Sequence, residues 1–229
     1  MPDLPYFSRI GGIASLLGVL LLFVATLLHP MQTPPWDAPA AFAEYAADRH
    51  WVGSHLGQLL GVLLGVIGLA ALTARLCDGR AGVWALLGLL LATVSLALAF
   101  ALQAVDGVAL KLMVSRWHDA SEASQALVFE AAYGVRQIEA GLASLMGIGF
   151  GITILFYGVA LCLSARAPTW LGLSGLLAGA AVLASSLVQA HTGFSALAMN
   201  SSMPSSLLLM LWQIAVGVYL LRAGQEKVM

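Results

Sequence analysis

The chain contains six runs of apolar residues, each long enough to cross a membrane as a helix. They lie at about residues 10–29, 52–75, 82–105, 137–164, 168–190 and 205–222. The hydrocarbon core of a bilayer is about 30 Å thick, so a spanning helix needs roughly 20 apolar residues. Because only helices and closed barrels satisfy every backbone hydrogen bond inside lipid, six helical runs of this length predict a helix bundle.

The composition favours the same class of protein. Hydrophobic residues make up 60% of the chain and charged residues only 9%, whereas soluble domains carry about 25% charged residues. We therefore expect an all-α, polytopic membrane protein that forms one transmembrane domain over residues 1–229. The net charge of −1 and the lack of a basic run argue against nucleic-acid binding. Cys77 and Cys162 are isolated and suggest neither a disulfide framework nor a zinc motif.

The distribution of Lys and Arg predicts the orientation of the bundle. Short loops and ends on one side carry Arg9, Arg75, Arg80, Arg166, Arg222 and Lys227. The longer segments on the other side carry Arg49, Lys111, Arg116 and Arg136. Because basic residues concentrate in short cytoplasmic loops, both termini are expected inside. A further helix is expected near 120–135, either on the membrane surface or as an outward extension of the fourth span.

In this topology, polar residues gather on the outer side. All five histidines belong there: His29, His50, His55, His118 and His191. The outer halves of the spans add Gln58, Gln103, Asp106, Arg136, Glu139, Gln189 and Gln213. Polar side chains at membrane depth are costly unless they face the bundle interior or a wet cavity. The pattern therefore predicts a polar, histidine-containing pocket that opens outward.

One hypothesis for this pocket is a cofactor site for electron transfer. His55 and His191 come from different spans, and two imidazoles from facing helices can hold haem b in a bundle. His29 is a third imidazole on the same side, and Arg136 could bind a haem propionate. A quinone or another redox partner would then exchange electrons with the haem. The remaining pocket residues in this hypothesis are Gln58, Gln103, Gln189 and Gln213.

Two other classes of function fit the same residues. The first is a metal-dependent enzyme acting on a lipid-like substrate, with Zn²⁺ or copper bound by His29, His55 and His191. Asp106 or Glu139 would then be the general base. The second class is non-catalytic: a transporter, a ligand-binding protein or an accessory subunit. In that class His55 donates a hydrogen bond to a loop carbonyl. Arg136 then forms a structural ion pair with Glu139, which lies three residues later on the same helix face.

Glycines recur at helical spacing in the second span. Gly57, Gly61 and Gly65 form two overlapping GxxxG motifs. Small residues at this spacing allow the backbones of two helices to approach closely in a membrane. The motifs predict tight packing, either within the bundle or between chains of a homo-oligomer or larger complex.

Two short motifs resemble an uncharacterised bacterial family of small six-span membrane proteins. "SRIGGIASLLGVLL" contains an Arg-(Ile/Leu)-(Ala/Gly)-Gly run at Arg9 to Gly12, as members of that family do. "YGVRQIEAGL", at 133–142, contains an Arg-x-Ile-Glu-Ala segment at Arg136 to Ala140. The resemblance implies a six-span fold and a multi-pass location in the bacterial inner membrane. It implies no activity.

Overall fold

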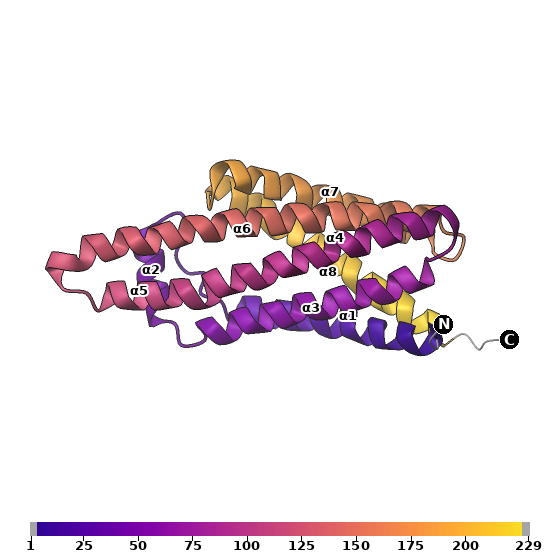
Figure 1. The fold of residues 1–229 in the computed structure, drawn as a ribbon, viewed down its shortest axis with the longest axis horizontal. Coiled ribbons are helices and arrows are strands. Elements are labelled where there is room, and N and C mark those ends of the chain that lie inside the picture. The colour runs from indigo at the N-terminus through magenta and orange to yellow at the C-terminus, as the bar shows by residue number, and fades with distance from the viewer. Residues whose placement is uncertain (1–3, 226–229) are drawn as a thin grey trace.

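A computed structural model describes residues 4–225, and Figure 1 shows the arrangement of the helices. Lys227, one of the charges used for the orientation, lies outside the described residues. The elements are α1 (Leu4–Leu27), α2 (Ala38–Ala47), α3 (Trp51–Arg75), α4 (Gly79–Gln103), the π-helix η1 (Ala104–Leu110), α5 (Lys111–His118), α6 (Glu122–Leu163), α7 (Thr169–Thr192) and α8 (Ala196–Ala223).

Six helical segments in the described residues are long and apolar enough to cross a membrane. They are α1, α3, the continuous α4–η1–α5 segment, α6, α7 and α8. Each predicted span overlaps one of them, so the predicted all-α, polytopic bundle is confirmed. The start of α1 and the end of α8 lie at the same end of the bundle (Figure 1). We call this the inner end and the opposite one the outer end, following the predicted orientation.

The six spanning segments pack in a closed ring. α1 packs against α3 and α8, α3 against α4, α4 against α6, α6 against α7, and α7 against α8. Neighbours in the ring are not always neighbours in the chain, since α8 closes the circle against α1. The first and last spans therefore share an interface, which starts at the inner end, where Gly224 lies against Arg9.

Glycines allow a close contact between α1 and α3. A Cβ at Gly61 would lie 2.8 Å from the carbonyl oxygen of Gly18, and a Cβ at Gly18 would lie 2.7 Å from the Gly61 oxygen. Either substitution would push the two backbones apart. The GxxxG motifs of α3 are therefore used inside the bundle, where Gly57 also faces Ala25 of α1.

Buried aromatic side chains are hydrogen-bonded between helices in the inner half of the bundle. Tyr157 of α6 is fully buried, and its hydroxyl lies 2.6 Å from the Thr73 hydroxyl and donates to the Leu69 carbonyl oxygen at 3.1 Å. Trp212 of α8 donates from its ring nitrogen to the Leu171 carbonyl oxygen at 3.0 Å. Buried polar groups of aromatic side chains thus find partners on neighbouring helices, as an apolar surrounding requires.

The outer end carries more helical structure than the sequence predicted. Of the two alternatives predicted for residues 120–135, the outward extension of the fourth span is correct and the separate surface helix is not, because α6 runs unbroken from Glu122 to Leu163. The separate additional helix is α2, which lies across the α5–α6 hairpin (Figure 1). Phe42, Tyr45 and Trp51 are buried there against Leu110 and Val114. This second apolar cluster fixes α2 at the outer end.

Candidate functional site

Buried His55 of α3 and half-buried Asp106 of η1 form a polar pair at the outer end. His55 Nε2 lies 3.0 Å from Asp106 Oδ2, and the histidine is 1% exposed. The other ring nitrogen, Nδ1, lies 2.6 Å from the Trp51 carbonyl oxygen. A carbonyl oxygen only accepts, so Nδ1 carries a hydrogen and donates it. A second proton must then lie between Nε2 and the carboxyl oxygen, and the pair as a unit holds it.

The π-helical turn η1 places Asp106 at this position. A π-helix is a rare insertion into an α-helix and often occurs at functional sites. Here it aims the Asp106 carboxyl group at His55, while the Asp106 carbonyl oxygen accepts a hydrogen bond of 3.1 Å from Trp51 Nε1. Gly107 makes the approach possible, because a Cβ there would lie 2.8 Å from the Cβ of His55.

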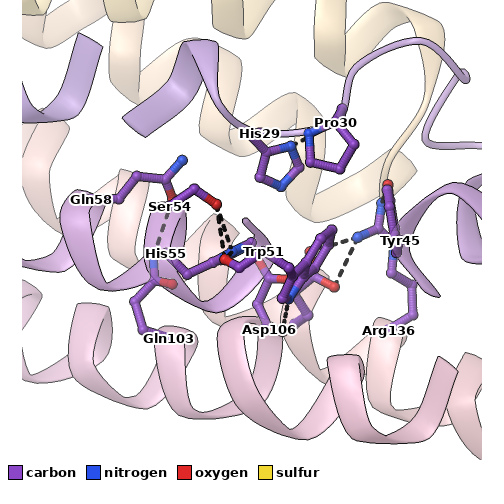
Figure 2. A network of polar contacts seen from close by, with 11 residues as sticks. His29, Pro30, Tyr45, Trp51, Ser54, His55, Gln58, Gln103, Asp106 and Arg136 are labelled. Carbon is purple, nitrogen blue, oxygen red and sulfur yellow. Dashed lines mark hydrogen bonds and ion pairs between the residues drawn. The ribbon is translucent and has the colours of Figure 1, made fainter. Parts of the chain in front are cut away.

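Aromatic rings connect this pair to the rest of the outer end (Figure 2). The ring of Trp51 lies 4.4 Å, centroid to centroid, from both Tyr45 and His55. His29, which follows α1, lies 5.0 Å from the rings of both Trp51 and His55. Two of the predicted histidines are thus brought together, although they come from different segments of the chain.

Arg136 and Glu139 form the ion pair that their spacing on α6 predicts. Arg136 Nη1 donates to both carboxylate oxygens, at 2.8 and 2.9 Å, and the two residues are 6% and 3% exposed. Arg136 Nη2 donates to the Tyr45 hydroxyl at 3.2 Å, and the guanidinium lies 4.0 Å from the ring centroid of Phe194. A buried charge requires such partners, because an unpaired one would be strongly destabilising.

α2 and the segment before it are held in place by two charged side chains. Lys111 Nζ donates to the carbonyl oxygens of Tyr45, Ala46 and Asp48, at 2.6, 2.9 and 2.8 Å, and so caps the C-terminal end of α2. The Glu44 carboxylate accepts from the backbone nitrogens of Gln32 and Thr33, at 3.0 and 2.8 Å, and from the Thr33 hydroxyl. Residues 28–37 are therefore tied to α2.

Burial shifts the pKa of two side chains of the outer cluster, His29 and Tyr45. Desolvation lowers the pKa of His29, and the neighbouring His55 lowers it further. Desolvation also raises the pKa of the Tyr45 hydroxyl, against the opposing effect of Arg136. Both shifts favour the neutral forms of the side chains at physiological pH.

Of the four glutamines predicted to line the pocket, two lie in the outer polar cluster and two lie elsewhere on α7 and α8. Gln103 Nε2 donates to Gln58 Oε1 at 3.5 Å, one turn from the His55–Asp106 pair. Gln103 Oε1 and Asp106 Oδ1 are both buried and have no hydrogen-bond partner in the described residues. Gln189 is half-buried on α7, and Gln213 is buried on α8. The first two belong to the outer polar cluster, and the other two do not.

His191 does not join the other histidines. It is exposed near the end of α7, a helix that packs against α6 and α8 and forms no interface with α3. Within residues 4–225, no group of three His, Cys, Asp or Glu side chains could hold a metal ion. The arrangement therefore gives no support to a metal site shared by His29, His55 and His191.

A large apolar cavity lies among the spanning helices. It has a volume of about 680 Å³ and is lined by α1, α3, α6 and α8. Phe23 and Leu27 line it from α1, and Met203 and Leu207 from α8; these four side chains are 51–62% exposed. The cavity thus reaches the lipid-facing surface between α1 and α8. Met31, in the segment held by Glu44, lines its outer end.

A second cavity, of about 380 Å³, lies where α2, α6 and the α7–α8 turn meet. Arg136, Trp36 and Phe194 are among its lining residues. Of the residues predicted to line an outward-opening polar pocket, only Arg136 lines this cavity, and no histidine does. Most of the other outer polar side chains are hydrogen-bonded to one another.

Sequence reasoning missed four residues of the outer cluster. Trp51 and Tyr45 form the aromatic core between the histidines, and Lys111 and Glu44 tie α2 to the bundle. The sequence does contain a signal for α2, because Asp37 followed by Pro39 is typical of the start of a helix. In the structure, the Asp37 carboxylate accepts a hydrogen bond from the backbone nitrogen of Ala40. The contacts made by Lys111 and Glu44 join distant segments and carry no local signal.

The sequence matches no protein-family model, no curated protein and no solved structure.

Proposed function

We propose that this integral membrane protein binds a lipid-like molecule inside its helix bundle. The observation that carries the proposal is the apolar cavity of about 680 Å³ between α1, α3, α6 and α8. Its volume lies within the range of small-molecule sites, about 300–1,000 Å³. This function belongs to the non-catalytic class: a ligand-binding protein, a transporter or an accessory subunit that presents the ligand to a partner.

The position of the cavity favours a ligand that arrives from the membrane. α1 and α8 are in close contact near the inner end, where a Cβ at Gly12 would lie 2.9 Å from the Gly217 carbonyl oxygen. Farther out, the same two helices line the cavity with Phe23 and Met203, which are half exposed. An opening between two spanning helices admits molecules that are dissolved in lipid.

The lining suits a flexible apolar chain. Met31, Met146, Met203 and Met210 all contribute to the wall. Methionine is unbranched and polarizable, and it adapts to irregular or variable apolar partners. Each buried CH₂ of such a chain would contribute about 0.8 kcal/mol to binding.

The outer polar cluster serves this function as a cap. His29 packs on Trp51 and His55, and Glu44 holds the backbone of Gln32 and Thr33. Between these anchors lies Met31, which lines the outer end of the cavity. The cluster thus fixes the segment that separates the cavity from the outer aqueous side.

Haem or metal ligation by His55 is a less favoured function. Both ring nitrogens of His55 are engaged, one with the Trp51 carbonyl oxygen and the other with Asp106. A metal ligand needs a free imidazole nitrogen, so binding would have to break one of these bonds. A quinone, expected from the sequence as a redox partner, is compatible with the cavity as one lipid-like molecule with an apolar tail.

A cavity-filling substitution tests the proposal. A Cβ at Gly65 would point into the cavity with only the Gln213 Nε2 atom near it, at 3.8 Å. Gly65→Leu should therefore occupy ligand space without displacing the backbone. Loss of room for two methylenes would weaken binding about tenfold. The measurement is titration of the protein in nanodiscs with a fluorescent polyene fatty alcohol.

Gly141→Leu is the matched control. Gly141 is exposed on α6, and a Cβ there meets nothing within 4 Å. This variant should bind the probe as the unmodified protein does. Equal binding by all three proteins, or saturable binding by none, would overturn the proposal.

A further inference from the structure

We infer that the ligand carries a hydroxyl group at its innermost end, and that this hydroxyl donates a hydrogen bond to Oε1 of Gln213. The inference rests on the proposed function and names the chemistry of the ligand. It follows from the orientation of one buried amide on α8.

Gln213 lies at the inner end of the cavity wall and is 8% exposed. Its Nε2 atom donates to the Ser15 hydroxyl at 3.1 Å and to the Gly65 carbonyl oxygen at 3.2 Å. A carbonyl oxygen can only accept, so the atom that faces Gly65 must be the amide nitrogen. The two contacts therefore fix which way the amide points, and they use both of its N–H groups.

The amide oxygen of Gln213 points away from Ser15 and Gly65, which bind the amide nitrogen. Among residues 4–225, no donor lies within hydrogen-bonding distance of Gln213 Oε1, and the atom is not fully enclosed by protein. Gln213 is one of the residues that line the cavity, and the inference places its free oxygen toward that space. An amide oxygen in an apolar surrounding lacks a partner at a cost of about 1–3 kcal/mol, which a ligand donor would remove.

The surrounding wall restricts what that donor can be. The part of the wall that the structure describes contains no Asp, Glu, Lys or Arg, so nothing there would neutralise a charged head group. An ester or ether oxygen could not pair with an acceptor. A neutral alcohol meets both conditions, with its hydroxyl at Gln213 and its chain running outward past Phe23 and Met203.

The test compares a long-chain alcohol with its methyl ether. Hexadecan-1-ol and 1-methoxyhexadecane share the same chain, but only the alcohol can donate. Each competes with the fluorescent probe for the full-length protein in nanodiscs. We expect the alcohol to bind about fivefold more tightly than the ether, the gain of one neutral hydrogen bond.

Two variants assign the preference to Gln213. Gln213→Met should abolish the preference for the alcohol and leave binding of the ether nearly unchanged. Ser15→Ala removes a hydrogen-bond partner of the same amide but leaves its oxygen in place, so the preference should remain. If Gln213→Met does not fold, Gln213→Asn keeps an amide that is one methylene too short to reach, and it should also lose the preference.

The outcomes separate this inference from the proposed function. Equal affinity for the alcohol and the ether, or a preference that survives removal of Gln213, would overturn the inference and leave lipid binding intact. Failure of both compounds to displace the probe would instead count against the cavity as a ligand site.

Discussion

At the scale of single residues, the outer cluster is organised around groups that hold protons. The His55–Asp106 pair shares a proton because both ring nitrogens of His55 face acceptors. His29 lies 5.0 Å from His55, and its Nδ1 donates to the Pro30 carbonyl oxygen at 2.9 Å. His29 is buried, and a proton on its ring would lie beside the proton that the His55–Asp106 pair holds, so the cluster favours neutral His29.

This arrangement predicts that acid destabilises the outer end. Desolvation and His55 lower the pKa of His29 below its ordinary value, whereas the unfolded chain titrates near about 6.5. As pH falls through that value, the unfolded state binds a proton that the folded state does not, so stability decreases. We expect the thermal unfolding temperature in detergent to fall between about pH 7 and pH 5.

A His29→Gln variant separates this effect from other titrations. Glutamine can keep a hydrogen bond to the Pro30 carbonyl oxygen but cannot become charged. The charged and titratable groups around His29, namely His55, Asp106, Arg136 and Tyr45, remain in place. The variant should lose part of the decrease in unfolding temperature; an unchanged pH profile would show that His29 is not responsible.

At the scale of helices, tight packing depends on where each glycine faces. Gly61 and Gly53 both lie in α3, but only Gly61 faces α1 closely. A Cβ at Gly61 would lie 2.7 Å from Leu22 Cγ and 2.8 Å from the Gly18 oxygen, whereas a Cβ at Gly53 meets nothing within 4 Å. The two positions form a natural matched pair.

We predict that Gly61→Ala and Gly53→Ala have opposite effects on stability. Gly61→Ala should force α1 and α3 apart and cost about 1–3 kcal/mol, as overpacking typically does. Gly53→Ala should be neutral or stabilising by up to about 1 kcal/mol, because alanine favours the helix. Thermal unfolding of both variants measures the difference. Equal unfolding temperatures would show that the Gly18–Gly61 contact is not critical.

Some of the helices could be predicted from the sequence, and others could not. Long apolar runs define the spanning helices, because each is determined locally by length and composition. α2 was missed because it has only ten residues and follows a proline-rich segment. η1 was missed because a π-turn depends on packing. Its Asp106 contacts His55, which lies 51 residues earlier in the chain, and Gly107 allows this close approach.

The candidate site was predictable only where it depends on spacing within one helix or on which end of the bundle a residue occupies. Spacing within a helix predicted the Arg136–Glu139 pair, and the topology correctly placed His29 and His55 at the same end. His191 is also at that end, but the ring order puts α7 away from α3. Helical periodicity says which residues share a face, and it does not say which helices become neighbours.

At the scale of the whole molecule, the cavity makes the outer half of the bundle different from the inner half. In the inner half, Tyr157 and Trp212 are hydrogen-bonded across helices. The cavity begins at Gln213 and reaches the surface toward the outer end, near Leu27 and Met31. A lipid-like ligand would therefore enter from the membrane leaflet on the outer side, and the orientation of the chain decides which leaflet that is.

The orientation predicts the accessibility of Cys77. This cysteine is exposed in the turn between α3 and α4 at the inner end, between Arg75 and Arg80. Because basic short loops stay in the cytoplasm, a membrane-impermeant maleimide should label Cys77 in inside-out vesicles and not in intact cells. Ser121→Cys in a Cys77→Ser background, placed between α5 and α6 at the outer end, should show the reverse pattern. Labelling of Cys77 from outside intact cells would reverse the bundle, and the cavity would then open in the cytoplasmic leaflet.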